Sequence, residues 1–94
     1  MFEVCYKDDD LVMGIEWTDD LPFIHHHIYE WKLSTHKKMK EVFALIVKDL
    51  QDKEHTELWS YYKKSSEHVN KFCNYYGFTR VSETETEYIV VKEI

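Results

Sequence analysis

A run of three histidines beginning at His25 is the first feature of this sequence that suggests chemistry. Alternate side chains of a strand share a face, so His25 and His27 would direct two imidazoles toward one metal ion. A third ligand would have to converge through the fold, from His36, His55 or His68. Because strong zinc signals carry a fuller ligand set, structural or surface histidines are favoured and no metal site is predicted.

Glu30 is a candidate general base, because it shares a face of a predicted strand with His26 and Ile28. A carboxylate on a mostly apolar face takes a raised pKa and then accepts protons near neutral pH. The alternative is an ordinary charged residue near a sheet edge, and the sequence alone favours that alternative.

A predicted helix start offers a third kind of site, for phosphate. Free backbone N–H groups gather there with two hydroxyls and two ammonium groups, in Ser34, Thr35, His36, Lys37 and Lys38. The segment has no glycine, so close backbone approach to a pyrophosphate is harder than in a glycine-rich loop. Capping of the helix explains Thr35 without any ligand.

The two cysteines are expected to be inert. Cys73 falls in the apolar stripe of a predicted short helix, with Val69, Phe72 and Tyr76, where a buried thiol is favoured over a nucleophile. Cys5 and Cys73 form no CxxC motif, and we expect both as free core thiols of a cytosolic protein.

The composition indicates one folded domain covering residues 1–94. Apolar residues make up 44% and aromatic residues 16%, with two glycines and one proline, which excludes a disordered chain. No apolar run approaches the ~20 residues of a membrane span, and the N-terminus has no signal-peptide pattern. A soluble intracellular protein is expected.

The formal net charge of −6 argues against a protein that binds a nucleic-acid backbone. Acidic residues gather in three runs, at 8–10, 19–20 and 83–87. Turn chemistry and solubility are the favoured explanation, because these runs coincide with predicted turns. An acidic surface that meets a basic partner or imitates nucleic acid is the alternative.

The elements that must position these residues begin with a hairpin. Phe2 to Tyr6 and Leu11 to Trp17 alternate apolar and polar residues around an acidic turn. Asp19 to Pro22 is predicted as a loop, and the aromatic and β-branched segment Phe23 to Leu33 as a long strand. A helix follows from Thr35, the predicted N-cap, to about Lys53.

That helix has the strongest pattern in the chain. Its apolar positions recur at i, i+3, i+4 and i+7: Met39, Val42, Phe43, Ile46, Val47 and Leu50. The opposite face carries charged residues at i, i+4 spacing, Lys37 with Glu41 and Lys48 with Asp52.

The rest of the chain returns to strands around one short helix. A strand is predicted over Thr56 to Tyr62, a connector over Lys63 to Ser66, a helix over Ser66 to Tyr76, and strands over Phe78 to Glu83 and Glu87 to Glu93. Gly77 suits the left-handed residue after a helix, with Phe78 folded back onto the last turn. The order β-β-β-α-β-α-β-β predicts an α+β fold, with a mixed, mostly antiparallel sheet of about six strands and two helices.

This order resembles the C-terminal two-thirds of the GNAT acyltransferase superfamily. Ser66 to Phe78 resembles its closing Asn-x-x-Ala-x-x-x-Tyr-x-x-x-Gly-Phe helix, and the strand His27 to Leu33 with the following helix resembles its acetyl-CoA-binding unit. Trp31 to Ser34, Glu57 to Tyr61 and Ser66 to Gly77 are also similar to small GNAT-like internal virion proteins of short-tailed phages. The chain would then be a truncated GNAT-like domain without the first helices.

The resemblance also assigns roles to individual positions. The superfamily's pyrophosphate loop, Gln/Arg-x-x-Gly-x-Gly/Ala, falls near Leu33 to Met39, which contains no glycine. The tyrosine that often protonates the departing CoA thiolate lies four residues before the Gly-Phe glycine, where this chain has Cys73. Glu30 matches a strand position at which some members carry a base.

Two functions follow as open alternatives. The first is a catalytically degenerate, phage-type protein that binds a host or virion protein, with no cofactor, in the host cytoplasm or the virion. The second is an active N-acetyltransferase that holds acetyl-CoA at Leu33 to Lys38 and uses Glu30 as base. Neither function involves a membrane or direct nucleic-acid binding, and a homodimer is consistent with exposed sheet edges.

Overall fold

The computed structural model describes residues 2–65 and 69–94. In these residues the predicted order of six strands and two helices is confirmed. The elements are β1 (Phe2–Lys7), β2 (Leu11–Thr18), β3 (Leu21–Ile28), α1 (Leu33–Asp52), β4 (Glu57–Lys63), α2 (Val69–Tyr76), β5 (Thr79–Glu83) and β6 (Glu87–Glu93). The expected helix start at Ser66 and the end of the preceding connector lie outside the described residues.

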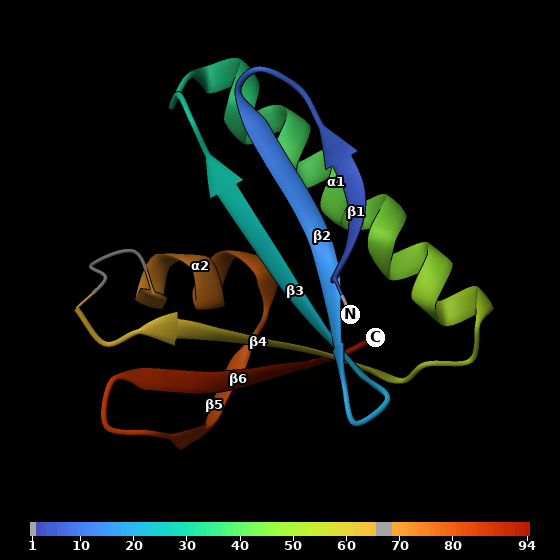
Figure 1. Ribbon diagram of the computed structural model, residues 1–94, viewed down its shortest axis with the longest axis vertical. Helices are drawn as coiled ribbons and strands as arrows, with labels where there is room; N and C mark the ends of the chain where they lie inside the picture. The colour runs from blue at the N-terminus through green and yellow to red at the C-terminus, as the bar shows by residue number, and fades with distance from the viewer. Residues whose placement is uncertain (1, 66–68) are drawn as a thin grey trace.

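The strands form one mixed sheet, in the order β1-β2-β3-β4-β6-β5. Neighbouring strands are antiparallel except β3 and β4, which run parallel with Phe23 opposite Trp59. Figure 1 shows these two strands diverging like the arms of a V beyond that pair. The predicted mixed, mostly antiparallel sheet is confirmed.

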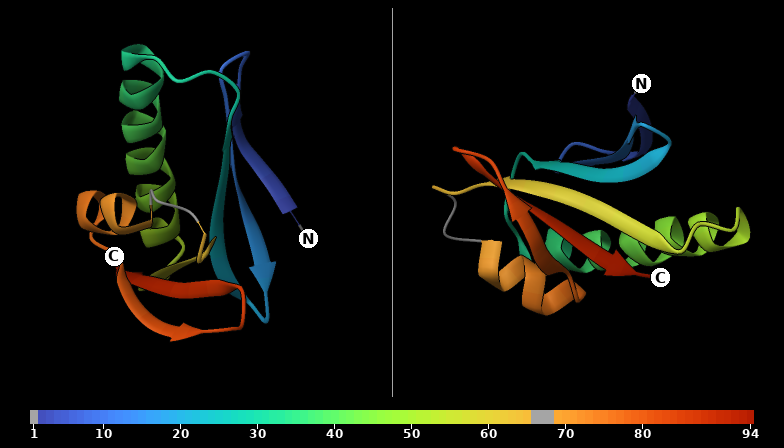
Figure 2. Two further views of the ribbon diagram at one scale, coloured as in Figure 1. Left: turned by 90° about the vertical axis from the view of Figure 1, so that its left-hand side faces the viewer. Right: turned by 90° about the horizontal axis from the view of Figure 1, so that it is seen from below.

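Both helices pack on the same face of the sheet (Figure 2). Because side chains alternate along a strand, each strand sends every second residue toward them. These inward residues are almost fully buried, and they include Leu11, Met13, Ile15, Ile24, Leu58 and Val90. The predicted apolar stripe of α1 lies against them through Met39, Val42, Phe43, Ile46 and Leu50.

The strand predicted over Phe23 to Leu33 is wrong at both ends. Asp19 and Asp20 have φ values of 52° and 65°, as a tight two-residue hairpin turn requires, so β3 already begins at Leu21. At the other end the amide of Tyr29 donates to the carbonyl oxygen of Asp10 at 2.8 Å, and the amide of Glu30 donates to the same oxygen at 3.4 Å. These bonds replace a strand ladder, and β3 ends at Ile28.

The start of α1 also differs from its prediction. Lys32 occupies the N-cap position and makes no side-chain capping bond. Thr35, the predicted cap, lies inside the helix and is fully buried. Its hydroxyl donates to the carbonyl oxygen of Glu30 at 2.9 Å, so it fixes the β3–α1 connection instead. At the other end of α1, the ammonium of the C-cap residue Lys53 lies 3.0 Å from the carboxylate of Asp49.

The end of α2 is as predicted. Gly77 has a φ of +77°, and the amides of Gly77 and Phe78 both donate to the carbonyl oxygen of Cys73 at 2.9 Å. Phe78 is 6% exposed and lies 5.5 Å from the ring of Phe72. This cap ends α2 and turns the chain into β5.

Candidate functional site

The divergence of β3 and β4 opens a cleft of about 560 Å³. The sheet and the loop after it contribute His26, His27, Ile28, Trp31 and Tyr62. The helices contribute His36, Met39, Lys71, Phe72, Tyr75 and Tyr76. Concave, largely aromatic surfaces of this size with a few polar groups are typical of ligand-binding sites.

His26 forms the floor of the cleft. Its imidazole stacks on Phe72, with ring centroids 5.4 Å apart and planes inclined by 15°. Burial lowers the pKa of His26 to about 4, and the neighbouring His25 and His27 add to this effect. The imidazole is therefore neutral at pH 7, able to form hydrogen bonds with a ligand but too weak a base to be charged there.

Two tyrosine hydroxyls are buried at the cleft. Burial raises the pKa of Tyr62 and raises that of Tyr76 to about 12. The Tyr76 hydroxyl has no hydrogen-bond partner among the described residues. A buried hydroxyl without a partner is uncommon, and this one is free to bond to a polar atom of a ligand.

The mouth of the cleft is aromatic and exposed. Tyr75 is 50% exposed and Trp31 60% exposed. The ring of His36 lies between them, 5.0 Å from Tyr75 and 6.4 Å from Trp31. Leu33, at the start of α1, is 88% exposed.

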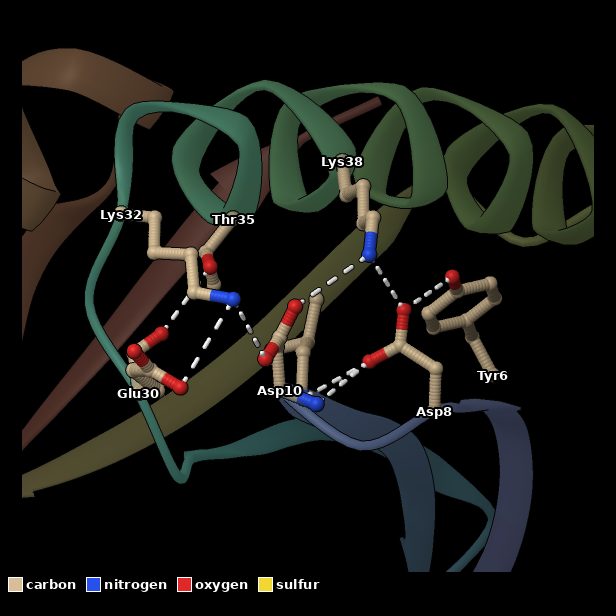
Figure 3. A network of polar contacts seen from close by, with 8 residues as sticks. Tyr6, Asp8, Asp10, Glu30, Lys32, Thr35 and Lys38 are labelled. Atoms are coloured by element: carbon tan, nitrogen blue, oxygen red, sulfur yellow. Dashed lines mark hydrogen bonds and ion pairs between the residues drawn. The ribbon is translucent and has the colours of Figure 1, made fainter.

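Glu30 does not lie on a strand, so the predicted strand face with His26 and Ile28 is wrong. It follows β3 in the connection to α1, with its side chain 64% exposed and its carboxylate 3.6 Å from the ammonium of Lys32 (Figure 3). It is not among the residues that line the cleft. Its backbone amide donates to the carbonyl oxygen of Asp10 in the β1–β2 turn, so Glu30 leaves the sheet and its side chain lies on the surface.

The predicted phosphate region, Leu33 to Lys38, is divided between four environments, and Thr35 is fully buried. His36 lines the cleft, whereas Leu33, Ser34 and Lys37 are exposed to solvent. Lys38 lies roughly 160° around the helix axis from His36 and points to the β1–β2 turn (Figure 3). Its ammonium is 2.7 Å from the carboxylate of Asp8 and 3.5 Å from that of Asp10.

The cysteines are free, as predicted, but they differ in exposure. Cys73 is partly buried, and burial raises the pKa of its thiol, which keeps it protonated and unreactive at neutral pH. Cys5 is exposed on the edge strand β1, so its assignment to the core is wrong.

The three histidines face two ways, as the alternation predicts. His25 is 3.6 Å from the carboxylate of Glu16 and packs edge-on to Tyr61 on the face away from the helices. His27 contacts the ring of Tyr29. Within residues 2–65 and 69–94 no three His, Cys, Asp or Glu side chains are grouped for a metal ion. His68, one of the proposed third ligands, lies outside the described residues.

Sequence patterns did not identify His26, Tyr62 and Tyr76 as site residues. Each sits at a position typical of the core: His26 between Ile24 and Ile28 on one strand face, Tyr62 two residues after Ser60, and Tyr76 in the apolar stripe of α2. The available signal was their polar atoms at otherwise apolar positions.

No protein-family model and no curated protein matches the chain in sequence. In structure it is similar to the crystal structure of a GNAT-family acetyltransferase from Listeria monocytogenes, with a TM-score of 0.67. The chain has the GNAT fold. The match covers 90% of this chain and 58% of the bacterial chain, at 16% sequence identity. The domain therefore spans less than two thirds of that acetyltransferase, and the likeness extends to the fold alone.

Proposed function

We propose that this protein is a GNAT-fold domain that does not transfer acetyl groups and acts by binding another protein. The observation that carries the proposal is the position of Glu30, which is exposed and paired with Lys32 outside the cleft. The described residues that line the cleft include no carboxylate. His26, the imidazole on its floor, has a pKa lowered to about 4, which makes it a poor general base.

The start of α1 also fits a pyrophosphate poorly. Residues 33–39 contain no glycine, so side chains stand where a cofactor would need close access to the backbone. Lys38, one of its two lysines, is already paired with Asp8 and Asp10. We therefore propose that the protein works without acetyl-CoA.

Calorimetric titration with acetyl-CoA tests whether the protein binds this cofactor. Release of free CoA thiol in the presence of a panel of amines tests whether it transfers acetyl groups. We expect no binding heat and no thiol release above the uncatalysed rate. Micromolar binding that is weakened by His36→Ala or Lys37→Ala would overturn the proposal. Lys40→Ala on an exposed position of α1 is the matched control. Lys38 variants are less suitable, because they also break the contact with Asp8.

An active N-acetyltransferase is the second candidate, and the cleft itself favours it. The Tyr76 hydroxyl, which has no partner among the described residues, would be a candidate proton donor. Cys73 occupies the position where the superfamily often has that tyrosine. If thiol release is seen, Tyr76→Phe should lower the turnover number while leaving the affinity for acetyl-CoA unchanged.

The proposed partner is a host or virion protein, and the proposed location is the host cytoplasm or the virion. Both the partner and the location are proposed from the sequence resemblance to small phage proteins. No helix among the described residues is long and apolar enough to cross a membrane. A homodimer is the alternative assembly, and its support is the exposed edge strand β1, with Phe2 48% and Val4 53% exposed. A monomeric mass in sedimentation at working concentration would exclude the homodimer.

A further inference from the structure

The face of the sheet opposite the helices is uncovered (Figure 2). We call this surface the open face and define it by the outward side chains of the strands. The register places Phe2, Phe23, Trp59 and Val91 in one row across it. Val4, His25, Tyr61 and Ile89 form the adjacent row. Exposed faces of antiparallel sheets are usually polar, whereas the centre of this one is mostly aromatic and aliphatic.

The aromatic side chains of the open face form one continuous group. Tyr61 is at its centre, with its ring 4.7 Å from His25 and 6.0 Å from Phe23. Phe23 continues to Trp59 at 6.0 Å, and His25 continues to Phe2 at 6.2 Å. Aromatic side chains that are fixed by their neighbours provide large contact area at little entropic cost, and they are enriched in protein interfaces.

Acidic side chains border this apolar group at the end where β4 begins, whereas Lys63 lies opposite Glu87 at the other end. Glu57 and Glu93 lie directly opposite each other on β4 and β6, and both are exposed. Like charges in a directly opposed cross-strand pair are destabilising, so the folded protein keeps an unfavourable contact at this edge. Glu16 lies within the first row, opposite Phe23. A cation from outside would relieve the repulsion between Glu57 and Glu93.

We propose that the open face binds an amphipathic helix of a partner protein, with an apolar stripe flanked by Lys or Arg. The apolar stripe would cover Phe23, Trp59 and Tyr61, and the basic flank would meet Glu57 and Glu93. A nucleic acid or an anionic membrane carries the wrong charge for this border, and a second copy would bring the same acidic border. This inference rests on the proposed protein-binding function and names its surface and partner class.

The test uses a synthetic helical peptide of leucine and lysine with one apolar face. A length of about 18 residues spans roughly 27 Å, comparable with the 34 × 31 × 24 Å extents of the domain. Binding is followed by fluorescence anisotropy and by amide chemical shifts of the labelled full chain. We expect saturable binding with shifts concentrated in β3, β4 and β6. A scrambled peptide of the same composition and a glutamate version should bind at least tenfold more weakly.

Charge removal on the protein provides the matched comparison. Glu57→Gln with Glu93→Gln should weaken binding about fivefold, as expected for the loss of two exposed ion pairs. Glu41→Gln with Asp52→Asn removes the same charge from exposed positions of α1, and should leave binding unchanged. All four positions are exposed, so both variants keep the fold, which the dispersion of the amide spectrum verifies.

Three results would overturn the inference: equal binding of the scrambled peptide, shifts confined to α1 or the cleft, or equal losses in the two charge variants. Sedimentation that shows a dimer through the open face would replace the partner with a second copy. Failure here leaves the non-catalytic proposal standing, since that proposal fails separately if acetyl-CoA binds and is consumed.

Discussion

The ammonium of Lys38 lies 2.7 Å from the carboxylate of Asp8, which joins the second turn of α1 to the turn between β1 and β2 (Figure 3). Asp8 also accepts the Tyr6 hydroxyl at 2.6 Å and the amides of Asp10 and Leu11 at 2.8 and 3.0 Å. The bonds from Lys38 and then Tyr6 hold the pKa of Asp8 far below its ordinary value. The predicted turn chemistry of the acidic run is thus confirmed at Asp8.

Asp8→Asn and Lys38→Met are each expected to lower the free energy of unfolding, and their effects should not add. Both substitutions remove the same contact, so the second has less to lose once the first is made. Chemical denaturation of the two single variants and the double variant measures this coupling. Asp9→Asn, an exposed neighbour, is the control and should be neutral. Strictly additive losses would show that Lys38 and Asp8 act independently.

Acid should destabilise the protein before its carboxylates titrate, because of His26. Its folded pKa is lowered to about 4, whereas an unfolded histidine titrates near 6.5. The unfolded chain therefore gains a proton first, and stability present above pH ~6.5 is lost as the pH falls toward 4. The loss is on the order of 3 kcal/mol at most. Asp8, whose pKa is lowered, contributes its own loss only below about pH 4.

Urea denaturation between pH 7.5 and 4.5 measures this slope, and the imidazole chemical shifts of His26 report its pKa directly. His26→Gln should flatten the slope, whereas His27→Gln, at an exposed position, should reduce it only slightly, because burial is the main cause of the lowered His26 pKa. Titration of His26 near 6.5 would show that its imidazole is hydrated.

The element order was predictable because each segment carries its own periodicity and several turns are marked by acidic residues or by Gly77. Prediction failed after β3, where aromatic residues continue the strand composition through Trp31. The strand ends because the Asp10 carbonyl oxygen accepts the amides of Tyr29 and Glu30. No local pattern contains that contact, and the placement of Glu30 on a strand failed with it.

The cleft was harder to predict than the fold. It exists because two parallel strands separate beyond one register pair, Phe23 with Trp59, and this depends on the whole sheet. His26 and Tyr76 have the spacing of core residues, so periodicity assigns them to packing. His36 alone among the predicted phosphate residues lines the cleft, because the helix turns Lys38 to the opposite flank.

Tyr76→Phe should leave the free energy of unfolding unchanged or raise it by up to about 1 kcal/mol, because the buried hydroxyl has no described partner. Ser60→Ala is the contrasting variant. The Ser60 hydroxyl donates to the carbonyl oxygen of Ile24 at 2.9 Å, and the residue is 1% exposed. Its loss should cost about 1 kcal/mol. Equilibrium denaturation compares the two, and a clear loss in Tyr76→Phe would reveal a partner for that hydroxyl.

Gly14→Ala should destabilise the protein by about 1–3 kcal/mol, as overpacking does in a filled site. A Cβ at Gly14 would lie 2.5 Å from the carbonyl oxygen of Glu3 and 2.6 Å from the ring of Phe2. The ring can move, but the carbonyl belongs to the backbone of β1, so the edge strand itself must shift. In a protein that already carries Phe2→Ala, Gly14→Ala should therefore still be destabilising, but less than in the native chain. Thermal and urea unfolding of the double variant and of Phe2→Ala alone measures this remaining loss. Full recovery would place the whole conflict in the ring, and an unperturbed single variant would show that β1 moves freely at this edge.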